Sequence, residues 1–102
     1  MSNVSYTDHQ WSPKDPAEVE SLGFDFSRLT PTVSQPDVTI EWISGAPDAN
    51  AVAMLAGSPT VVGAVVSVLI QGGVAGADYR LRCRVVSGDG CLRILSGVLP
   101  VR

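Results

Sequence analysis

The chain has 102 residues, of which 45% are hydrophobic and 17% are charged, with ten glycines and seven prolines. A chain of this length forms one domain and leaves no room for a catalytic domain beside a second module. Its composition excludes a disordered or mainly helical protein and favours an all-β domain rich in turns.

The formal net charge of −3 is unevenly distributed. Residues 1–56 carry two basic and eight acidic side chains, a net charge of −6, whereas residues 57–102 carry five arginines and two aspartates, a net charge of +3. Either oppositely charged surfaces bring copies or partners together, or oppositely charged strands pair within one fold. Arginines without lysines or aromatic platforms on an acidic chain do not indicate a nucleic-acid partner.

The amino-terminal residues lack the basic start and apolar core of a secretory signal, so we expect synthesis and retention in the cytoplasm. The longest apolar run, residues 60–71, is well short of the ~20 residues needed to span a bilayer as a helix. Pro59 and Gly72 bound this run. We therefore interpret it as part of the core and expect no membrane partner.

Residues 1–21 are predicted to form an extended N-terminal arm, and residues 22–102 a β-sandwich domain. Pro13 and Pro16 disfavour helical geometry, and the charged residues of the segment favour solvation. Trp11 is the exception, because an arm cannot bury this ring by itself. The ring is an anchor either onto its own domain, which we favour, or onto a neighbouring subunit.

Period-two alternation predicts a first strand over residues 22–29, with Phe24 and Phe26 facing the core. A second strand is predicted over residues 38–43, with Trp42 as the central aromatic residue of the core. Residues 49–56 are predicted to form a third strand, with a single helical turn as the alternative.

Residues 60–70 are predicted to form one continuous strand that is apolar on both faces. We expect the second sheet to cover one face, and the arm or another subunit to cover the other. The inner face would comprise Val62, Ala64, Val66, Val68 and Ile70. The outer face would comprise Val61, Val65 and Leu69.

A glycine-rich corner over residues 72–78 precedes a strand in which Tyr79 and Cys83 share the inner face. A tyrosine at this position can place its ring in the core while its hydroxyl reaches back to the connection. This arrangement is a tyrosine corner, a trait of immunoglobulin-like domains. The elements together predict an all-β fold, an immunoglobulin-like antiparallel β-sandwich of about seven strands with an extended N-terminal arm.

Residues 87–90 are predicted to join the last two strands as a tight hairpin. A two-residue loop at Gly88 and Asp89 would place Cys83 opposite Ile94. That register would bury Leu92, Ile94 and Val98. A slip of one residue, which the sequence leaves open, would instead bury Leu95, Leu99 and Val101.

The two cysteines are offset along this hairpin by about three residues, or ~10 Å, which exceeds the ~7 Å Cα separation that a disulfide tolerates. Cys83 is expected to be a small buried hydrophobic residue. Cys91 lies near the exposed tip, so it is a candidate for an intersubunit disulfide once the assembly leaves the reducing cytoplasm.

No motif in the chain indicates catalysis. His9 is the only histidine and has no partners at metal-ligand spacing, so we interpret it as solvated. Nucleophile motifs are absent, and the glycines at 72, 73 and 76 lead into a strand rather than into a helix that could bind phosphate. We predict that the protein is not an enzyme and uses no metal and no cofactor.

Several segments resemble a family of small bacteriophage virion proteins described as fibre-tail adaptor or minor structural proteins. The similar segments are residues 11–19, residues 24–29, the corner at 70–79, the strand at 82–85, the glycine-containing hairpin and the ending at 99–102. The chain departs from the family pattern at Cys91, where a serine or threonine and an arginine are usual, and in residues 45–59.

The resemblance implies a non-enzymatic virion structural protein, an adaptor or decoration subunit that joins tail, neck or capsid components such as fibres. It implies other virion proteins as partners, several symmetric copies, and localisation in the virion after synthesis in the bacterial cytoplasm. For the arm and the sheet, we expect partner contacts at Trp11, Pro13, Val19, Arg80, Arg82 and Arg84. The alternative for the arginines is an ordinary solvated strand face.

A second functional hypothesis is a carbohydrate- or receptor-binding β-sandwich module displayed on the virion. Such a module needs exposed aromatic side chains on loops near polar groups. Tyr6, Trp11 and Trp42 are the aromatic residues available for this role.

Overall fold

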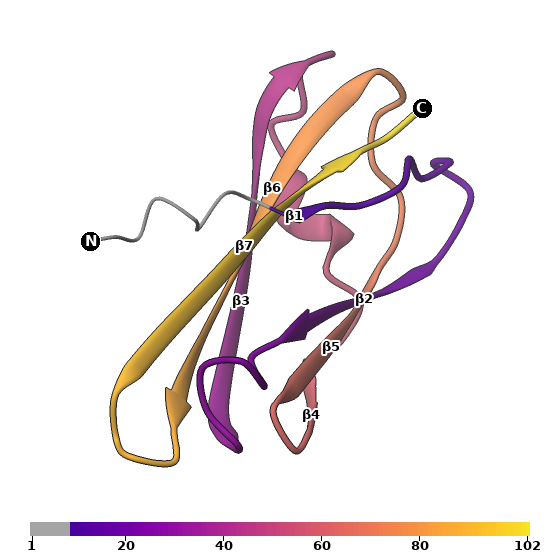
Figure 1. Ribbon diagram of the computed structural model, residues 1–102. Helices are drawn as coiled ribbons and strands as arrows, with labels where there is room; N and C mark the ends of the chain where they lie inside the picture. The colour runs from indigo at the N-terminus through magenta and orange to yellow at the C-terminus, as the bar shows by residue number, and fades with distance from the viewer. Residues whose placement is uncertain (1–8) are drawn as a thin grey trace.

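The computed structural model describes residues 9–102, and over this range the chain forms two β-sheets (Figure 1). One sheet has the strand order β1-β7-β6-β3 and the other β2-β5-β4. All neighbouring strands are antiparallel except β1, which pairs with β7 in parallel. The elements are β1 (His9–Gln10), β2 (Glu20–Asp25), β3 (Val33–Gly45), the 3-10 helix η2 (Ala51–Met54), β4 (Thr60–Val62), β5 (Val65–Ile70), β6 (Ala77–Ser87) and β7 (Leu92–Pro100). The predicted all-β class is confirmed.

A single hydrophobic core draws on both sheets. Alternate residues of β2, β5 and β6 face it, as the period of two requires. Phe24 and Phe26 of the predicted first strand are buried, with 3% and 0% of their surface exposed. From β6, the buried residues are Ala77, Tyr79, Leu81, Cys83 and Val85. The inward faces predicted for these two segments are therefore confirmed.

Tyr79 connects the core to two loops at one end of the sheets. Its ring is fully buried, and its hydroxyl accepts a hydrogen bond from the Val74 N–H at 2.9 Å. The same hydroxyl donates to Asp48 Oδ2 at 2.7 Å. The predicted contact between the hydroxyl and the preceding corner is present, and the bond to Asp48 adds a tie to the loop after β3.

Trp42 is not the central aromatic residue of the core, and this prediction was wrong. It pairs with Tyr79 across the β3–β6 ladder and faces the same side, but it is 40% exposed. The reason is its position in the sheet: Trp42 lies on β3, the terminal strand, so a neighbouring strand, β6, flanks its indole on one side only. Tyr79 lies one strand further in and occupies the centre.

Residues 60–70 form a hairpin rather than the predicted single strand. Gly63 has a φ of +60°, which a residue with a Cβ rarely adopts, and it allows β4 to fold back on β5. The turn reverses the faces of the first part, so Val62 is 79% exposed and Val61 packs against the core. Val65 and Leu69 lie on the outer face as predicted.

Residues 49–56 contain the single helical turn that was the alternative prediction, so the predicted third strand was wrong. Asp48 Oδ1 accepts a hydrogen bond from the Asn50 N–H at 2.8 Å and turns the chain. One turn of 3-10 helix follows and buries Ala51 and Met54 against the core.

The β6–β7 hairpin has the alternative register. Cys83 pairs with Leu95 instead of Ile94, because the loop has three residues and Gly90 adopts a φ of +86°. Ser87 closes this loop by donating its N–H to the Cys91 carbonyl at 2.8 Å. Leu92 and Ile94 are therefore 63% and 46% exposed rather than buried. The buried residues of β7 and its extension are Gly97, Leu99, Pro100 and Val101. Leu95 is partly buried against the core, and Val98, predicted to be buried, lies on the outer face opposite Arg80.

Replacing Tyr79 with phenylalanine should destabilise the protein by about 1–3 kcal/mol, because the Val74 N–H loses its acceptor and Asp48 its donor. Chemical denaturation measures this loss. Asp48→Asn and the double variant complete a mutant cycle, in which the Tyr79 and Asp48 effects should be non-additive. Additive effects would contradict a direct contribution of their hydrogen bond.

Candidate protein-interaction site

An arginine column runs along the outer face of β6 and comprises Arg80, Arg82 and Arg84. Ladder pairing places this column between two others. On β3, Glu41, Thr39 and Asp37 lie opposite the three arginines in that order. On β7, their partners are Val98, Ser96 and Ile94. The predicted contact arginines are thus brought together on one sheet face, between a mostly acidic column and a partly apolar one.

Part of the charge asymmetry of the sequence is resolved within this sheet. Arg84 Nη2 lies 3.5 Å from Asp37 Oδ2, and both side chains are more than half exposed. Such exposed pairs contribute little to stability. Oppositely charged strands therefore pair within one fold, which was one of the two explanations for the uneven charge.

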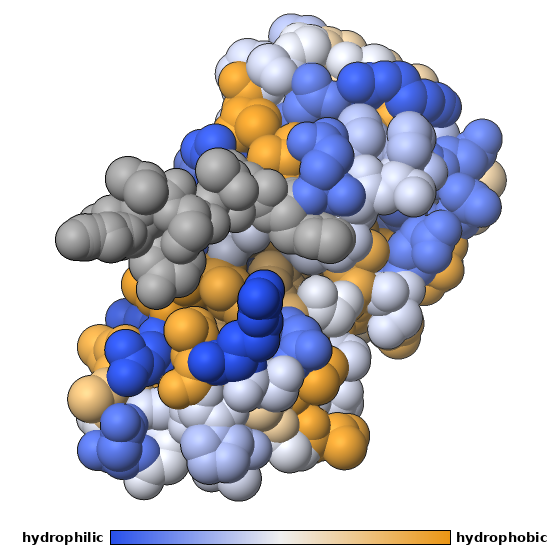
Figure 2. Space-filling model, in the orientation of Figure 1, coloured by the Kyte–Doolittle hydropathy of each residue, from blue (hydrophilic) through white to orange (hydrophobic). Residues whose placement is uncertain are grey.

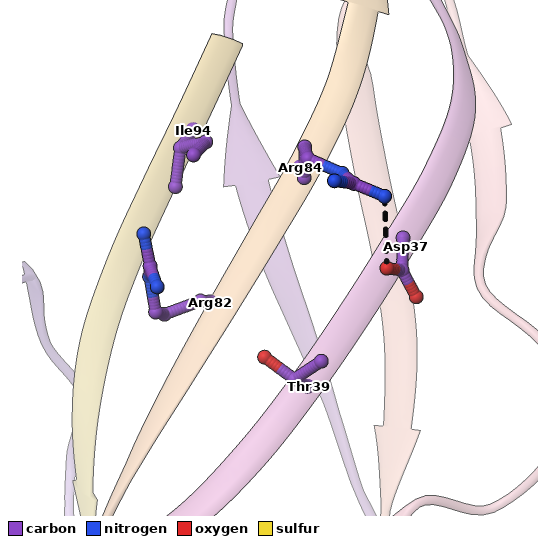
Figure 3. Close-up of a pocket in the computed structure, with 5 residues that line it drawn as sticks. All are labelled: Asp37, Thr39, Arg82, Arg84 and Ile94. Atoms are coloured by element: carbon purple, nitrogen blue, oxygen red, sulfur yellow. Dashed lines mark ion pairs between the residues drawn. The ribbon is translucent and has the colours of Figure 1, made fainter. Parts of the chain in front are cut away.

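The arginine column borders a shallow pocket of about 190 Å³, lined by Asp37, Thr39, Arg82, Arg84 and Ile94 (Figure 3). Arg84 extends toward Asp37 on β3, whereas Arg82 extends toward β7 (Figure 3). Within residues 9–102, no acidic group lies within ion-pair distance of Arg82. An exposed guanidinium beside Ile94 can bind a carboxylate while its stem packs on an apolar group.

The described part of the arm is attached to β7. The Trp11 N–H donates to the Val98 carbonyl at 3.1 Å, and the Lys14 N–H donates to the Pro100 carbonyl at 2.9 Å. The Arg102 N–H returns a bond to the Lys14 carbonyl at 2.8 Å. Residues 9–14 therefore extend one edge of the sheet, and residues 1–8 of the predicted arm lie outside the described part of the chain.

Lys14 is fully buried, which sequence reasoning did not anticipate. Its Nζ donates to the Gly72 carbonyl at 2.7 Å and to the Asp15 carbonyl at 2.9 Å. The ammonium group thus satisfies the carbonyl of a residue in the glycine-rich corner, 58 positions away. No local pattern indicates this role, because lysines between prolines are normally solvated.

Trp11 packs on its own domain. Its ring meets Phe24 edge to face, with centroids 5.4 Å apart and planes at 90°. Such pairs add stability beyond simple burial. The two other arm residues singled out by the sequence, Pro13 and Val19, are exposed, and Val19 has 61% of its surface accessible.

Both cysteines are free. Cys83 is buried in the core as predicted, and desolvation, with a smaller effect of the Asp37 charge, raises the pKa of its thiol to about 12. Cys91 is exposed beside the β6–β7 turn. Cys83 pairs with Leu95, four residues after Cys91, so the two cysteines do not lie opposite each other in the hairpin.

Over residues 9–102 there is no cluster of three or more histidine, cysteine, aspartate or glutamate side chains that could hold a metal ion. In the same range no helix has the length and hydrophobicity to cross a membrane. The aromatic residues considered for ligand binding are dispersed. Trp42 lies on a strand, Trp11 is half-buried, and Tyr6 is outside the described residues.

The family model described as Gp77, podophage GP4 fiber-tail adaptor protein gp77, matches residues 14–101. The chain belongs to this fibre-tail adaptor family. The predicted resemblance is thereby confirmed, and membership indicates a structural adaptor role in the phage virion. No curated protein matches the chain. The fibre-tail adaptor match begins at Lys14, so it includes Val19, the arginine column and Cys91, and it leaves out Trp11 and Pro13.

In the native fibre-tail adaptor, a maleimide at pH 8 should label one cysteine per chain, at Cys91. A thiol with a pKa near 12 has only about one molecule in ten thousand ionised at pH 8, and Cys83 is also shielded by the core. Mass spectrometry should find two labels after denaturation. Rapid labelling of Cys83 under native conditions would contradict its burial.

Lys14→Ala should destabilise the protein by about 1–3 kcal/mol, because the partly buried hydrogen bond from the Lys14 ammonium to the Gly72 carbonyl is lost together with the packing of a fully buried side chain. Hydrogen exchange should accelerate first at the amides of Trp11 and Lys14, which bond to β7. Exchange in β6 should change only with global stability. Lys14→Met, which keeps most of the buried stem, separates the loss of the ammonium from the loss of packing.

Proposed function

We propose that the chain is a non-enzymatic adaptor subunit that joins a fibre to the tail, neck or capsid of a phage particle. The family match over residues 14–101 carries this proposal. The arginine column supports it, because Arg82 and Arg84 are exposed and lie beside apolar residues on β7. We propose that Trp11, Pro13 and Val19 contribute from the arm, although Trp11 is half-buried in its own domain.

The chemistry of the outer sheet face suits a protein partner. Arginine is enriched at protein interfaces because its guanidinium binds carboxylates and its stem packs on apolar groups. Leu92 and Ile94 are exposed on the same face as Arg84, so hydrophobic area accompanies the charge. Figure 2 shows hydrophobic side chains next to strongly hydrophilic ones on the face of the molecule that it presents. An acidic partner surface would meet both features, and Arg82 provides a guanidinium with no acidic group within ion-pair distance among residues 9–102.

We further propose that the two sheets form a variant of the immunoglobulin-like sandwich, which the tyrosine corner at Tyr79 supports. Assembly into several symmetric copies is part of the same proposal. Val65 and Leu69 support it, since they leave an apolar strip exposed on the outer face of β5. Cys91 is exposed and free, so it could form a disulfide between subunits in the released particle.

Reversing two charges in the arginine column should release the adaptor or the fibre from the particle. We expect Arg82→Glu with Arg84→Glu to lower the fibre content at least tenfold, because an acidic partner would face like charges. The fibre content would be measured by quantitative mass spectrometry and electron microscopy on phage particles assembled with the variant protein.

Arg28→Glu is the matched control, since Arg28 is exposed and lies outside the proposed contacts. All purified variants should melt within a few degrees of the wild type, because the exposed Arg84–Asp37 pair contributes little to stability. Particles with normal fibre content in the double variant would contradict the role of the arginine column. Glycan binding by a stable monomer would favour the alternative of a displayed carbohydrate-binding module.

A further inference from the structure

The β3 edge, residues 37–42 on the side away from β6, is an unpaired strand edge. In the strand order β1-β7-β6-β3, the strand β3 is terminal. Between Ser34 and Gly45, its backbone hydrogen-bonds only to β6 among the described residues. The opposite margin of the sheet differs, since residues 9–14 cover β7. A row of amide and carbonyl groups on β3 is thus available to an added strand.

Irregularities limit this edge to a short segment. Gln35 has a φ of +52° and precedes Pro36, and the ladder shifts register between Ser34 and Asp37. A second shift lies between Trp42 and Ser44. Bulges and prolines at both ends of an edge restrict indiscriminate pairing. The six residues between them keep one regular register, which is enough for a recognition strand.

Side chains on both faces of the β3 edge specify what could bind there. On the outer face, Asp37 and Glu41 flank Thr39. Arginines of β6 lie opposite both carboxylates on one side, and an added strand would place its own outer residues on the other side. On the inner face, Trp42 is 40% exposed at the margin of the core. A strand with basic residues on one face and apolar residues on the other complements both features.

The same charges disfavour a second copy as the occupant. In an antiparallel pair of two β3 strands centred on Thr39, Asp37 of each copy would lie opposite Glu41 of the other. Like charges directly opposite in a ladder are destabilising. The acidic side chains of the β3 edge therefore disfavour pairing between two copies in this register and favour a basic strand from a different protein.

We propose that the β3 edge binds an extended segment of a partner virion protein by strand addition, and that this segment alternates lysine or arginine with apolar residues. The inference rests on the proposed adaptor role and specifies how that role is carried out. Backbone hydrogen bonds would provide affinity, and Asp37, Glu41 and Trp42 would provide the choice of sequence. Burial of Trp42 by the added strand would make this tryptophan a binding hot spot, a role that aromatic residues commonly have at interfaces.

The test uses the full-length protein and an eight-residue peptide of alternating lysine and valine. We expect saturable binding by fluorescence titration, and at least tenfold slower hydrogen exchange at those amides of residues 37–42 that point away from β6. A glutamate–valine peptide of equal length should bind at least tenfold more weakly. A lysine–valine peptide with N-methyl groups on one backbone edge should lose affinity to the same extent, because it cannot complete the ladder.

The protein variant Asp37→Asn with Glu41→Gln should weaken binding of the lysine–valine peptide at least tenfold. Its matched control is Glu20→Gln with Asp25→Asn, which neutralises two acidic residues of β2 at the edge of the other sheet and should bind as the wild type does. Asp25, Asp37 and Glu41 are exposed and Glu20 is partly exposed, so neither double variant should disturb the core. Melting temperatures equal to that of the wild type would verify that both variants fold.

The inference would be overturned by the absence of peptide binding, by equal binding of the N-methylated peptide, or by protection located outside residues 37–42. A dimer of the free protein with protected β3 amides would also overturn it, in favour of self-pairing. The adaptor role is tested separately on particles with the arginine variant. Fibre loss in that variant together with failure of the peptide test would therefore refute strand addition alone.

Discussion

The hydroxyl of Tyr79 is the polar constraint on which this all-β domain depends. The ring fills the centre of a core shared by both sheets, so its oxygen must find partners at the end of the strands. It accepts from the corner at Val74 and donates to Asp48 in the loop after β3. One side chain thereby ties together two of the connections between the sheets, the loop after β3 and the corner before β6, and the Asp48 bond also lowers the pKa of that carboxyl group.

Local alternation was sufficient to predict the fold class and the inward faces around Phe24, Phe26 and Tyr79. It failed where the outcome depended on a turn or on strand order. Gly63 and Gly90 could each occupy a strand or a left-handed turn, and the choice of turn set the register of the following strand. Trp42 lies on the face that alternation predicts, but the order of strands in a sheet is a non-local property, so its exposure was not predictable.

The interaction surface was partly predictable for the same reasons. The period of two placed Arg80, Arg82 and Arg84 on one outer face, and the structure aligns them between β3 and β7. The positions of Asp37 and Glu41 beside the arginines could not be predicted, because the cross-strand register pairs residues more than 35 positions apart in the sequence. Burial of Lys14 also lacked a local signal, since it depends on a carbonyl of the corner at Gly72.

The parallel pairing of the arm with the last strand has a mechanical consequence for a protein that connects two parts of a particle. The bonds that Trp11 and Lys14 make to β7, with the return bond from Arg102, cross between two strands running in the same direction. Tension that pulls residue 9 and residue 102 apart along those strands would load all of these bonds together in shear, instead of opening them one after another. The Lys14 ammonium, bonded to the Gly72 and Asp15 carbonyls, lies beside these backbone bonds and would add its own hydrogen bonds to the resistance against such tension.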